Sequence, residues 1–283
     1  MPHRFSIASF SFHGLMAIGE MDVFRYFEAV RHRFHLDAAD IWNGMLISYD
    51  DDYLRRVRRA MDECGLTLVN LCCDKAHIWS DGDEERAIVE RGQEDCLRAA
   101  EILGAASVRF DLGIGGADAT DQQIEFCARQ YDRLCARAAR FGARLGPENH
   151  WGASTNVAAM RRLFQAVRAD NFGLLLHLGN WQKSDPFDAE RAAQYDQEFI
   201  GRAMHTHVMY EVCEQAERRL PPLAADYAGA WGIESHKGTN ELNNVAYQLA
   251  SVRRVVAPVD YARPPMSGPG DPFFKILMDK LRA

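Results

Sequence analysis

The sequence lacks several features that would assign a function directly. Seven cysteines are present, but they form no Cys-x-x-Cys pair and no regular spacing, which argues against a disulfide framework and indicates reduced thiols. No signal peptide and no long apolar run are found, so we predict a cytoplasmic protein that does not insert into a membrane. The short run Gly113-Ile114-Gly115-Gly116 is typical of a turn, and the sequence contains no glycine-rich phosphate-binding loop.

An excess of positive charge is also missing. The chain has 33 Lys and Arg against 40 Asp and Glu, a net charge of −7 that argues against a nucleic-acid partner. A hydrophobic content of 47% and a charged content of 26% are ordinary for a soluble globular protein with a sizeable core. The length of 283 residues allows one large α/β domain or two small ones, so the pattern along the chain has to decide.

Strand-like and helix-like patterns alternate strictly along the chain. Strand patterns occupy residues 4–12, 36–42, 66–73, 105–112, 143–149, 172–178, 202–209 and 229–234. Helical patterns follow them at 22–34, 53–64, 84–103, 121–141, 153–168, 186–200, 214–225 and 240–256. Eight such pairs without a break in composition require parallel strands joined by right-handed crossovers. The sequence therefore predicts an α/β fold, a single (β/α)8 TIM barrel over residues 1–257.

An open, doubly wound parallel sheet is the alternative fold. It usually has a glycine-rich turn after its first strand, and Ser11-Phe12-His13-Gly14 contains no G-x-G-x-x-G pattern. Residues 258–283 are rich in Pro and Gly near their start. We predict that they form a C-terminal extension packed on the barrel, with a short helix over 273–281.

The ends of the last four predicted strands carry residues that can bind a metal ion. In a barrel of this kind the active site lies at the carboxyl ends of the strands, and neighbouring strands stand about 4.8 Å apart. We therefore expect one divalent metal site built from Glu148, His177, His207 and Glu234. Two carboxylates and two imidazoles suit Mn²⁺, Co²⁺ or Zn²⁺ better than Ca²⁺ or Mg²⁺. His205 shares the parity of His207 and is expected to lie one layer deeper.

Other roles remain open for these side chains. A glutamate at a strand end can cap a neighbouring helix or pair with an arginine, and His177 can be a hydrogen-bonded imidazole close to the core.

Four stretches resemble those of a known family: Glu148-Asn149-His150-Trp151-Gly152, His177-Leu178-Gly179-Asn180-Trp181, His205-Thr206-His207 and Gly232-Ile233-Glu234. With them the chain, from Phe5 to about Val256, resembles the sugar phosphate isomerase/epimerase superfamily of xylose isomerase-like barrels. In that family the metal ligands are Glu, Asp, His and Glu in chain order. Glu148, His207 and Glu234 match this order, whereas His177 stands where the family has an aspartate. The exchange either favours a softer metal or leaves a site with three ligands.

The resemblance implies a metal-assisted proton transfer next to a carbonyl of an unphosphorylated keto-sugar or cyclitol. Glu148 and Glu234 are then the catalytic pair, one removing and the other returning the proton through an enediolate. Further polar and aromatic candidates for substrate binding at the strand ends are Trp42, Lys75, His77, Arg109, His150, Trp151 and His236. Phe12, Trp79 and Trp181 are other aromatic residues that either stack on a sugar ring or pack in the core.

Three alternative functions stay open. A metal-dependent lyase or dehydratase would eliminate a group from a keto-sugar, a 3-keto-glycoside or an inosose at the same site. An AP-endonuclease-like phosphodiesterase needs more metal ligands and a basic face, and the net charge of −7 disfavours it. A non-catalytic sugar-binding barrel would bind no metal. Barrels of this kind often form homo-oligomers, but no stretch of the sequence identifies an interface.

Overall fold

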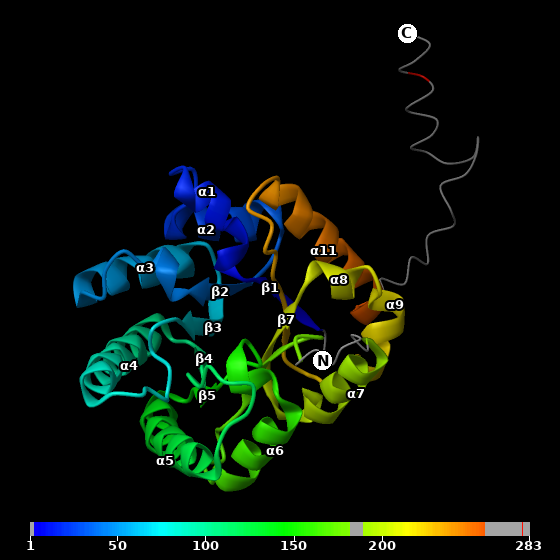
Figure 1. Ribbon diagram of the computed structural model, residues 1–283. Coiled ribbons are helices and arrows are strands. Elements are labelled where there is room, and N and C mark those ends of the chain that lie inside the picture. Colours follow the sequence, from blue (N-terminus) through cyan, green and yellow to red (C-terminus); the bar gives the residue numbers. More distant parts are fainter. Residues whose placement is uncertain (1–2, 182–188, 258–278, 280–283) are drawn as a thin grey trace.

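Eight short parallel strands form the centre of the molecule (Figure 1). The computed structural model describes residues 3–181, 189–257 and 279, and within them the strands are β1 (Arg4–Ile7), β2 (Ala38–Trp42), β3 (Thr67–Cys73), β4 (Ser107–Phe110), β5 (Arg144–Gly146), β6 (Leu174–His177), β7 (Ala203–Val208) and β8 (Ala230–Ile233). They pair as two four-stranded sheets, in the orders β1-β8-β7-β6 and β2-β3-β4-β5. Isolated bridges between Ala8 and Asp40 and between Glu148 and Leu175 connect the two sheets at both edges. The strands therefore follow one another in a ring, and the predicted TIM barrel is confirmed.

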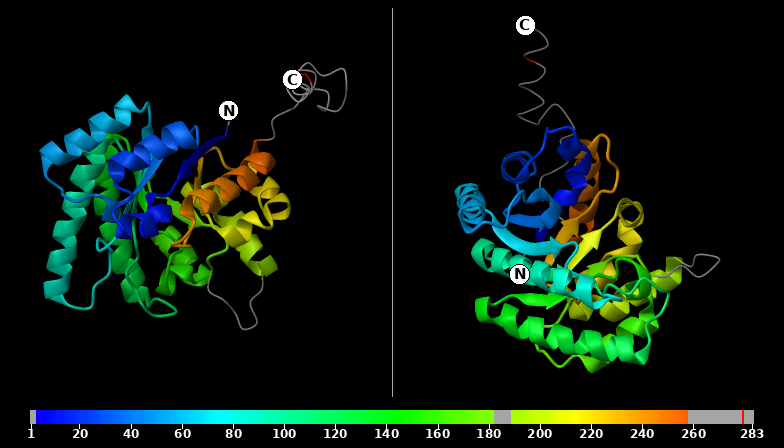
Figure 2. Two further views of the ribbon diagram at one scale, coloured as in Figure 1. Left: turned by 90° about the horizontal axis from the view of Figure 1, so that it is seen from above. Right: turned by 60° about the vertical axis from the view of Figure 1, so that its left-hand side comes forward.

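Helices surround this ring on the outside, as Figure 2 shows from two further directions. In the described residues they are α1 (His13–Ala17), α2 (Val23–Glu28), α3 (Asp51–Glu63), α4 (Asp83–Leu103), α5 (Asp121–Ala138), α6 (Val157–Ala166), α7 (Ala189–Phe199), α8 (Tyr210–Cys213), α9 (Ala216–Arg219), α10 (Pro221–Ala224) and α11 (Glu241–Val256). The predicted helix over 214–225 is divided between α9 and α10, and α8 precedes it. Pro221 begins α10, where its missing N–H leaves no helical hydrogen bond unmade.

Local sequence explains why these helices form where they do. Helix α5 begins at a capping box in which Gln123 N donates to the Thr120 hydroxyl and Thr120 N donates to the Gln123 side chain. Its buried residues Ile124, Tyr131 and Leu134 recur at helical spacing and face the barrel. Full burial of each such side chain contributes about 1.5–3 kcal/mol. Helix α4 ends at Gly104, whose φ of 70° allows the left-handed turn that a helix end requires.

The first strand is shorter than predicted, and this decides between the two roles left open for Phe12. β1 ends at Ile7, and Ser9–Phe12 forms a 3-10 turn. The hydroxyl of Ser9 accepts a hydrogen bond from Trp42 N, and that of Ser11 accepts one from Ser235 N, so serine side chains replace the ladder of the sheet. Phe12 is turned into the core, with its ring 6.2 Å from that of Tyr26, and Phe10 takes the place at the strand end.

Two predicted regions fall outside the described residues. They are the C-terminal extension over 258–283, of which only Asp279 is described, and residues 182–188 at the start of the predicted helix 186–200. Among the residues that are described, no helix is both long and apolar enough to cross a membrane.

Candidate metal centre and active-site cavity

A cavity of about 390 Å³ opens at the carboxyl ends of the strands. It is lined by residues at or just beyond seven of the eight strand ends: Ala8, Phe10, Asp40, Trp42, Cys72, Asp74, Arg109, Glu148, His150, His207, Glu234 and His236. The apolar part of this wall includes Phe10 and Trp42, whose rings pack edge to face at 5.3 Å. The rest of the wall consists mainly of carboxylates and imidazoles. Ionisable side chains therefore lie next to an aromatic surface on which a ring could stack.

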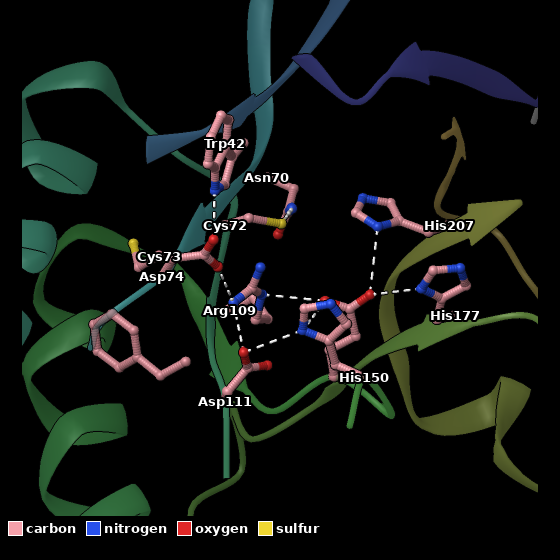
Figure 3. Close-up of polar contacts among 12 residues, drawn as sticks. Trp42, Asn70, Cys72, Cys73, Asp74, Arg109, Asp111, His150, His177 and His207 are labelled. Carbon is pink, nitrogen blue, oxygen red and sulfur yellow. Dashed lines mark hydrogen bonds and ion pairs between the residues drawn. The ribbon is translucent and has the colours of Figure 1, made fainter. Parts of the chain in front are cut away.

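The structure brings the four predicted metal ligands together. Figure 3 shows two of them, His177 and His207. Each offers one donor atom, and all four atoms lie within 4.8 Å of one another. His177 Nδ1 lies 2.9 Å from Glu148 Oε1 and 3.6 Å from Glu234 Oε2. His207 Nδ1 lies 3.5 Å and 3.3 Å from the same two oxygens. Bonds of about 2.0–2.2 Å to one ion separate neighbouring ligands by about 3.0–3.5 Å, so these residues could hold a metal ion.

Two of these donor atoms have no hydrogen-bond partner. His207 Nδ1 and Glu234 Oε2 are buried, and no donor or acceptor among the described residues is aligned with them, although His236 Nε2 lies 3.1 Å from the glutamate oxygen. Buried polar groups are rarely left in this state unless another group completes the site. An imidazole nitrogen that converges on two buried carboxylates favours a cation at that point, either a proton on Nδ1 or a metal ion.

The charges around the four predicted ligands also favour a cation between them. Burial would raise the pKa of Glu148, but His150, His177 and His207 outweigh it, and the net pKa lies well below the usual value. Burial would lower the pKa of His207, but the carboxylates of Glu234 and Asp40 raise it well above the usual value. The carboxylates are therefore ionised, and the position between them stabilises positive charge.

A second set of charges lies on the other side of Glu148. The guanidinium of Arg109 donates from Nη1 to Asp74 Oδ1 at 2.9 Å and to Asp111 Oδ2 at 3.0 Å, and its Nε lies 3.2 Å from Glu148 Oε2. Asp74 also accepts a hydrogen bond from Trp42 Nε1 at 2.6 Å. Asp111, Glu148 and His150 are close enough for another cation. Arg109 already supplies a positive charge there, which opposes the binding of a second metal ion.

Asp111 orients the residues that follow β5. Its Oδ2 accepts from Trp151 Nε1 at 3.2 Å and lies 3.2 Å from His150 Nδ1. Burial opposes the charged form of this imidazole, but the hydrogen bond to Asp111 prevails and raises the pKa of His150 to about 9. His150 therefore faces the cavity as a cation at neutral pH.

Backbone contacts fix the loops that carry the first two ligands. Asn149 Oδ1 accepts from His177 N at 2.7 Å, and Asn149 Nδ2 donates to His177 O at 2.8 Å. Asn180 Nδ2 donates to the carbonyls of Asn149 and His150 at 2.7 Å and 2.9 Å. The two asparagines thereby join the ends of β5 and β6, which explains why both motifs contain one.

Several sequence candidates lie away from the cavity lining. Lys75 is exposed, and His77 lies 3.3 Å from the Ser80 hydroxyl. Trp79 packs edge to face on Phe126, and the buried Trp181 donates to Asp196 Oδ1 at 2.8 Å. Trp42, Arg109, His150 and His236 do line the cavity, and Trp151 is 41% exposed beside Asp111.

Five of the lining residues were not among the predicted site residues: Ala8, Phe10, Asp40, Cys72 and Asp74. Asp40 had a detectable signal, because a carboxylate inside the apolar strand Ala38–Trp42 must find a partner. Asp74 lies directly before Lys75, and only the geometry of the strand end shows which of these neighbours faces the cavity.

Known proteins with the same architecture were found by comparison. The model of the family described as xylose isomerase-like TIM barrel matches residues 23–237. No curated protein sequence matches the chain. Among solved structures, an L-ribulose 3-epimerase is similar with a TM-score of 0.71 at 14% identity, covering 94% of this chain and 100% of its own.

Two other solved structures illustrate the range of activities among similar folds. A 3-keto-D-glucoside 4-epimerase from E. coli has a TM-score of 0.68 at 16% identity, with 89% of this chain and 99% of that chain covered. A probable 3-DHS dehydratase from Bacillus anthracis has a TM-score of 0.63 at 11% identity, with 87% and 98% covered. At these identities the likeness concerns the fold.

Proposed function

Because this chain belongs to the xylose isomerase-like TIM barrel family, we propose that it is a divalent-metal-dependent isomerase or epimerase of a keto-sugar or cyclitol. One observation carries the proposal. Two buried glutamates, Glu148 and Glu234, line one cavity together with His207, and the donor atoms of His207 and Glu234 lack hydrogen-bond partners. A bound divalent ion would polarise the substrate carbonyl and stabilise the negative charge that develops when the neighbouring carbon loses its proton.

The two glutamates divide between them the roles that proton transfer requires. Arg109 Nε lies 3.2 Å from Glu148 Oε2, so this carboxylate is held in a fixed orientation. Glu234 Oε2 lies 3.1 Å from His236, which is half exposed in the cavity wall. One carboxylate removes the proton next to the carbonyl. The other takes up a proton from solvent and returns it to the resulting enediolate, and the first then releases its proton to solvent. Phe10 and Trp42 would stack on the apolar face of the sugar.

The polar wall favours a substrate without a phosphate. Among the described residues that line the cavity, Arg109 carries the only guanidinium or ammonium group, and this group already faces Asp74, Asp111 and Glu148. A phosphate dianion would meet carboxylates, and the imidazolium of His150, which is already held by Asp111, is not a free cationic fork that could bind it. We therefore expect turnover of neutral ketoses and not of their phosphate esters.

The test is a proton-exchange experiment in D2O. The purified protein is loaded with Mn²⁺, Co²⁺ or Zn²⁺ and incubated with a panel of ketohexoses, ketopentoses and inososes, each with its phosphate ester where one exists. NMR should show deuterium at the carbon beside the carbonyl and a rearranged sugar of unchanged composition. Absence of exchange with every member of the panel would contradict the proposal.

A lyase or dehydratase is the second candidate, and the position of His150 favours it. The imidazole is oriented by Asp111 and lines the cavity, where it could donate a proton to a departing hydroxyl group. The same NMR experiment separates the two reactions, because elimination gives an unsaturated product and releases water or an alcohol.

A further inference from the structure

A buried carboxylate lies directly beneath the proposed metal centre. Asp40, in β2, is completely buried, and its Oδ2 lies 2.7 Å from His205 Nε2 and 3.0 Å from His207 Nε2. Its Oδ1 accepts a hydrogen bond from Asn70 Nδ2 at 2.9 Å, and Asn70 Oδ1 accepts one from the Ser107 hydroxyl at 2.9 Å. Residues of β2, β3, β4 and β7 thus meet in one polar chain across the barrel interior.

This contact determines which nitrogen of His207 faces the cavity. An ionised carboxylate can only accept hydrogen bonds, so the 3.0 Å contact requires a proton on His207 Nε2. The other nitrogen, Nδ1, then presents its lone pair between Glu148 and Glu234 at 3.5 Å and 3.3 Å. Histidines that bind metal ions generally donate their second N–H to a carboxylate or carbonyl in this way, which fixes the ring.

The neighbouring residues hold Asp40 in place. His205, which shares the parity of His207 along β7, contacts the same oxygen from one layer below. Gly232 leaves the space that this pair occupies, since a Cβ there would lie 2.7 Å from His205 Nε2 and 3.2 Å from Asp40 Oδ2. A larger residue at position 232 would displace the carboxylate or the imidazole.

We propose that Asp40 is a positioning residue of the metal centre: it fixes the His207 ring so that Nδ1 faces Glu148 and Glu234, while His205 and Asn70 fix Asp40 itself. The inference rests on the metal dependence proposed above. An ion between Asp40, His205 and His207 would also satisfy the distances. It would leave His207 Nδ1 and Glu234 Oε2 without partners, whereas an ion between the glutamates gives both atoms one.

Metal affinity measured without any substrate tests the proposal. Calorimetric titration of the metal-free protein with Mn²⁺ and Zn²⁺ compares wild type with Asp40→Asn, Asp40→Ala and Glu198→Gln. Asparagine keeps an acceptor but loses the charge, so we expect binding about 10–100-fold weaker, and weaker still for alanine. Glu198 lies in an exposed pair with Arg161 outside the cavity lining, so its variant should bind within about threefold of wild type.

Two outcomes of the titration overturn the proposal. The first is an Asp40→Asn variant whose metal affinity stays within about threefold of wild type. Loss of the hydrogen-bond partner of a metal-binding histidine weakens binding by more than this. The second is loss of all binding in both Asp40 variants while Glu148→Gln and Glu234→Gln still bind, since the ion would then lie at Asp40 itself. Thermal unfolding of each variant establishes that the protein titrated is folded.

A measurement on the wild type does not depend on any variant folding. Long-range 1H–15N NMR of the zinc-loaded protein with 15N-labelled histidine should show a proton on His207 Nε2 and a metal-bound Nδ1. A proton on Nδ1 overturns the inference. If the protein binds zinc with the proton on His207 Nε2 and yet turns over no keto-sugar, that result contradicts the proposed reaction and still supports the role of Asp40. A wild-type protein that binds no divalent ion overturns both.

Discussion

The two sides of the cavity differ in how their charges are paired (Figure 3). On the unpaired side, toward β6, β7 and β8, only imidazoles face Glu234, and His207 Nδ1 and Glu234 Oε2 are buried without an aligned hydrogen-bond partner. Toward β2, β3 and β4, Arg109 lies between Asp74 and Asp111 at 2.9 Å and 3.0 Å. Glu148 belongs to both sides, because its Oε1 faces His177 and its Oε2 faces Arg109.

The difference indicates where the chemistry occurs. A buried polar group without a partner costs about 1–3 kcal/mol, so convergence of several such groups implies that another group completes the site. On the paired side, toward β2, β3 and β4, the permanent charge of Arg109 already lies between two carboxylates, although Arg109 Nε and Asp111 Oδ1 also lack an aligned hydrogen-bond partner. We infer that the unpaired side binds and reacts, and that the paired side keeps Glu148 oriented.

The largest effect is expected from neutralising the unpaired side. Glu148→Gln and Glu234→Gln keep the size of each side chain but remove a metal-binding, proton-accepting oxygen. Each should lower turnover by about 10²–10⁴-fold and weaken metal binding, as measured by steady-state kinetics and by the metal content of the purified protein. The control is Glu198→Gln, at an exposed pair with Arg161, which should behave as wild type. Full metal content and turnover in both cavity variants would refute the assignment.

Breaking the paired side should change stability and metal affinity in opposite directions. Arg109→Met leaves Asp111 and Glu148 as buried charges without their cation, which should lower the free energy of unfolding by about 3–5 kcal/mol. The lost positive charge should at the same time tighten divalent-metal binding, because the potential at the centre becomes more negative. Urea unfolding with a chelator and metal titration measure the two quantities.

An exposed arginine provides the control for this comparison. Arg161→Met breaks a surface pair and should cost about 1 kcal/mol or less. Two results would contradict the comparison: an Arg109→Met variant as stable as Arg161→Met, or one that binds metal more weakly than wild type. Either would show that the Arg109 side does not differ from the side of Glu234 and His207 in its charge pairing.

Sequence patterns sufficed for the barrel and for the convergence of Glu148, His177, His207 and Glu234. Both follow from local rules: alternation of strand and helix sets the fold, and parity sets which strand-end residues face the interior. His205 lies a layer below His207 on the same face, as the parity of β7 predicts.

The remaining residues required three-dimensional information. Phe10 replaced Phe12 at the cavity because serine hydroxyls ended β1 early, an outcome that depends on contacts with Trp42 and Ser235 far along the chain. Asp74 faces Arg109, whereas Lys75 has a φ of 61° and points to solvent. The turn at this strand end decides between the neighbours, and no periodic pattern in the sequence describes that turn.

A smaller effect should separate the two histidines of the unpaired side. His207 has Asp40 behind it, whereas His177 Nε2 is buried without a partner, so His177 is the less firmly held ligand. We expect metal binding to weaken about tenfold in His177→Ala and at least about a hundredfold in His207→Ala. His177→Asp should shift preference toward Mg²⁺, since a carboxylate oxygen is a harder ligand than an imidazole nitrogen. Equal losses of metal affinity in the two alanine variants would show that His177 and His207 are held equally firmly.

The smallest effect is the pH dependence of metal binding, and it depends on His207. Glu234 and Asp40 raise the pKa of His207 above its usual value against the effect of burial, so in the metal-free protein a proton competes with the metal ion for Nδ1. A metal ion must displace the Nδ1 proton, while Asp40 retains the Nε2 proton. Apparent metal affinity should therefore rise about tenfold per pH unit up to the raised pKa of His207 and then level off.

Other groups near the centre add no pH dependence near neutrality. Glu148 and Glu234 have pKa values well below the usual range, and the pKa of His150 is about 9. Calorimetry in buffers of different ionisation enthalpy should show one proton released for each metal ion bound. A metal affinity that does not change with pH between about 6 and 8 would show that His207 does not exchange a proton for the metal.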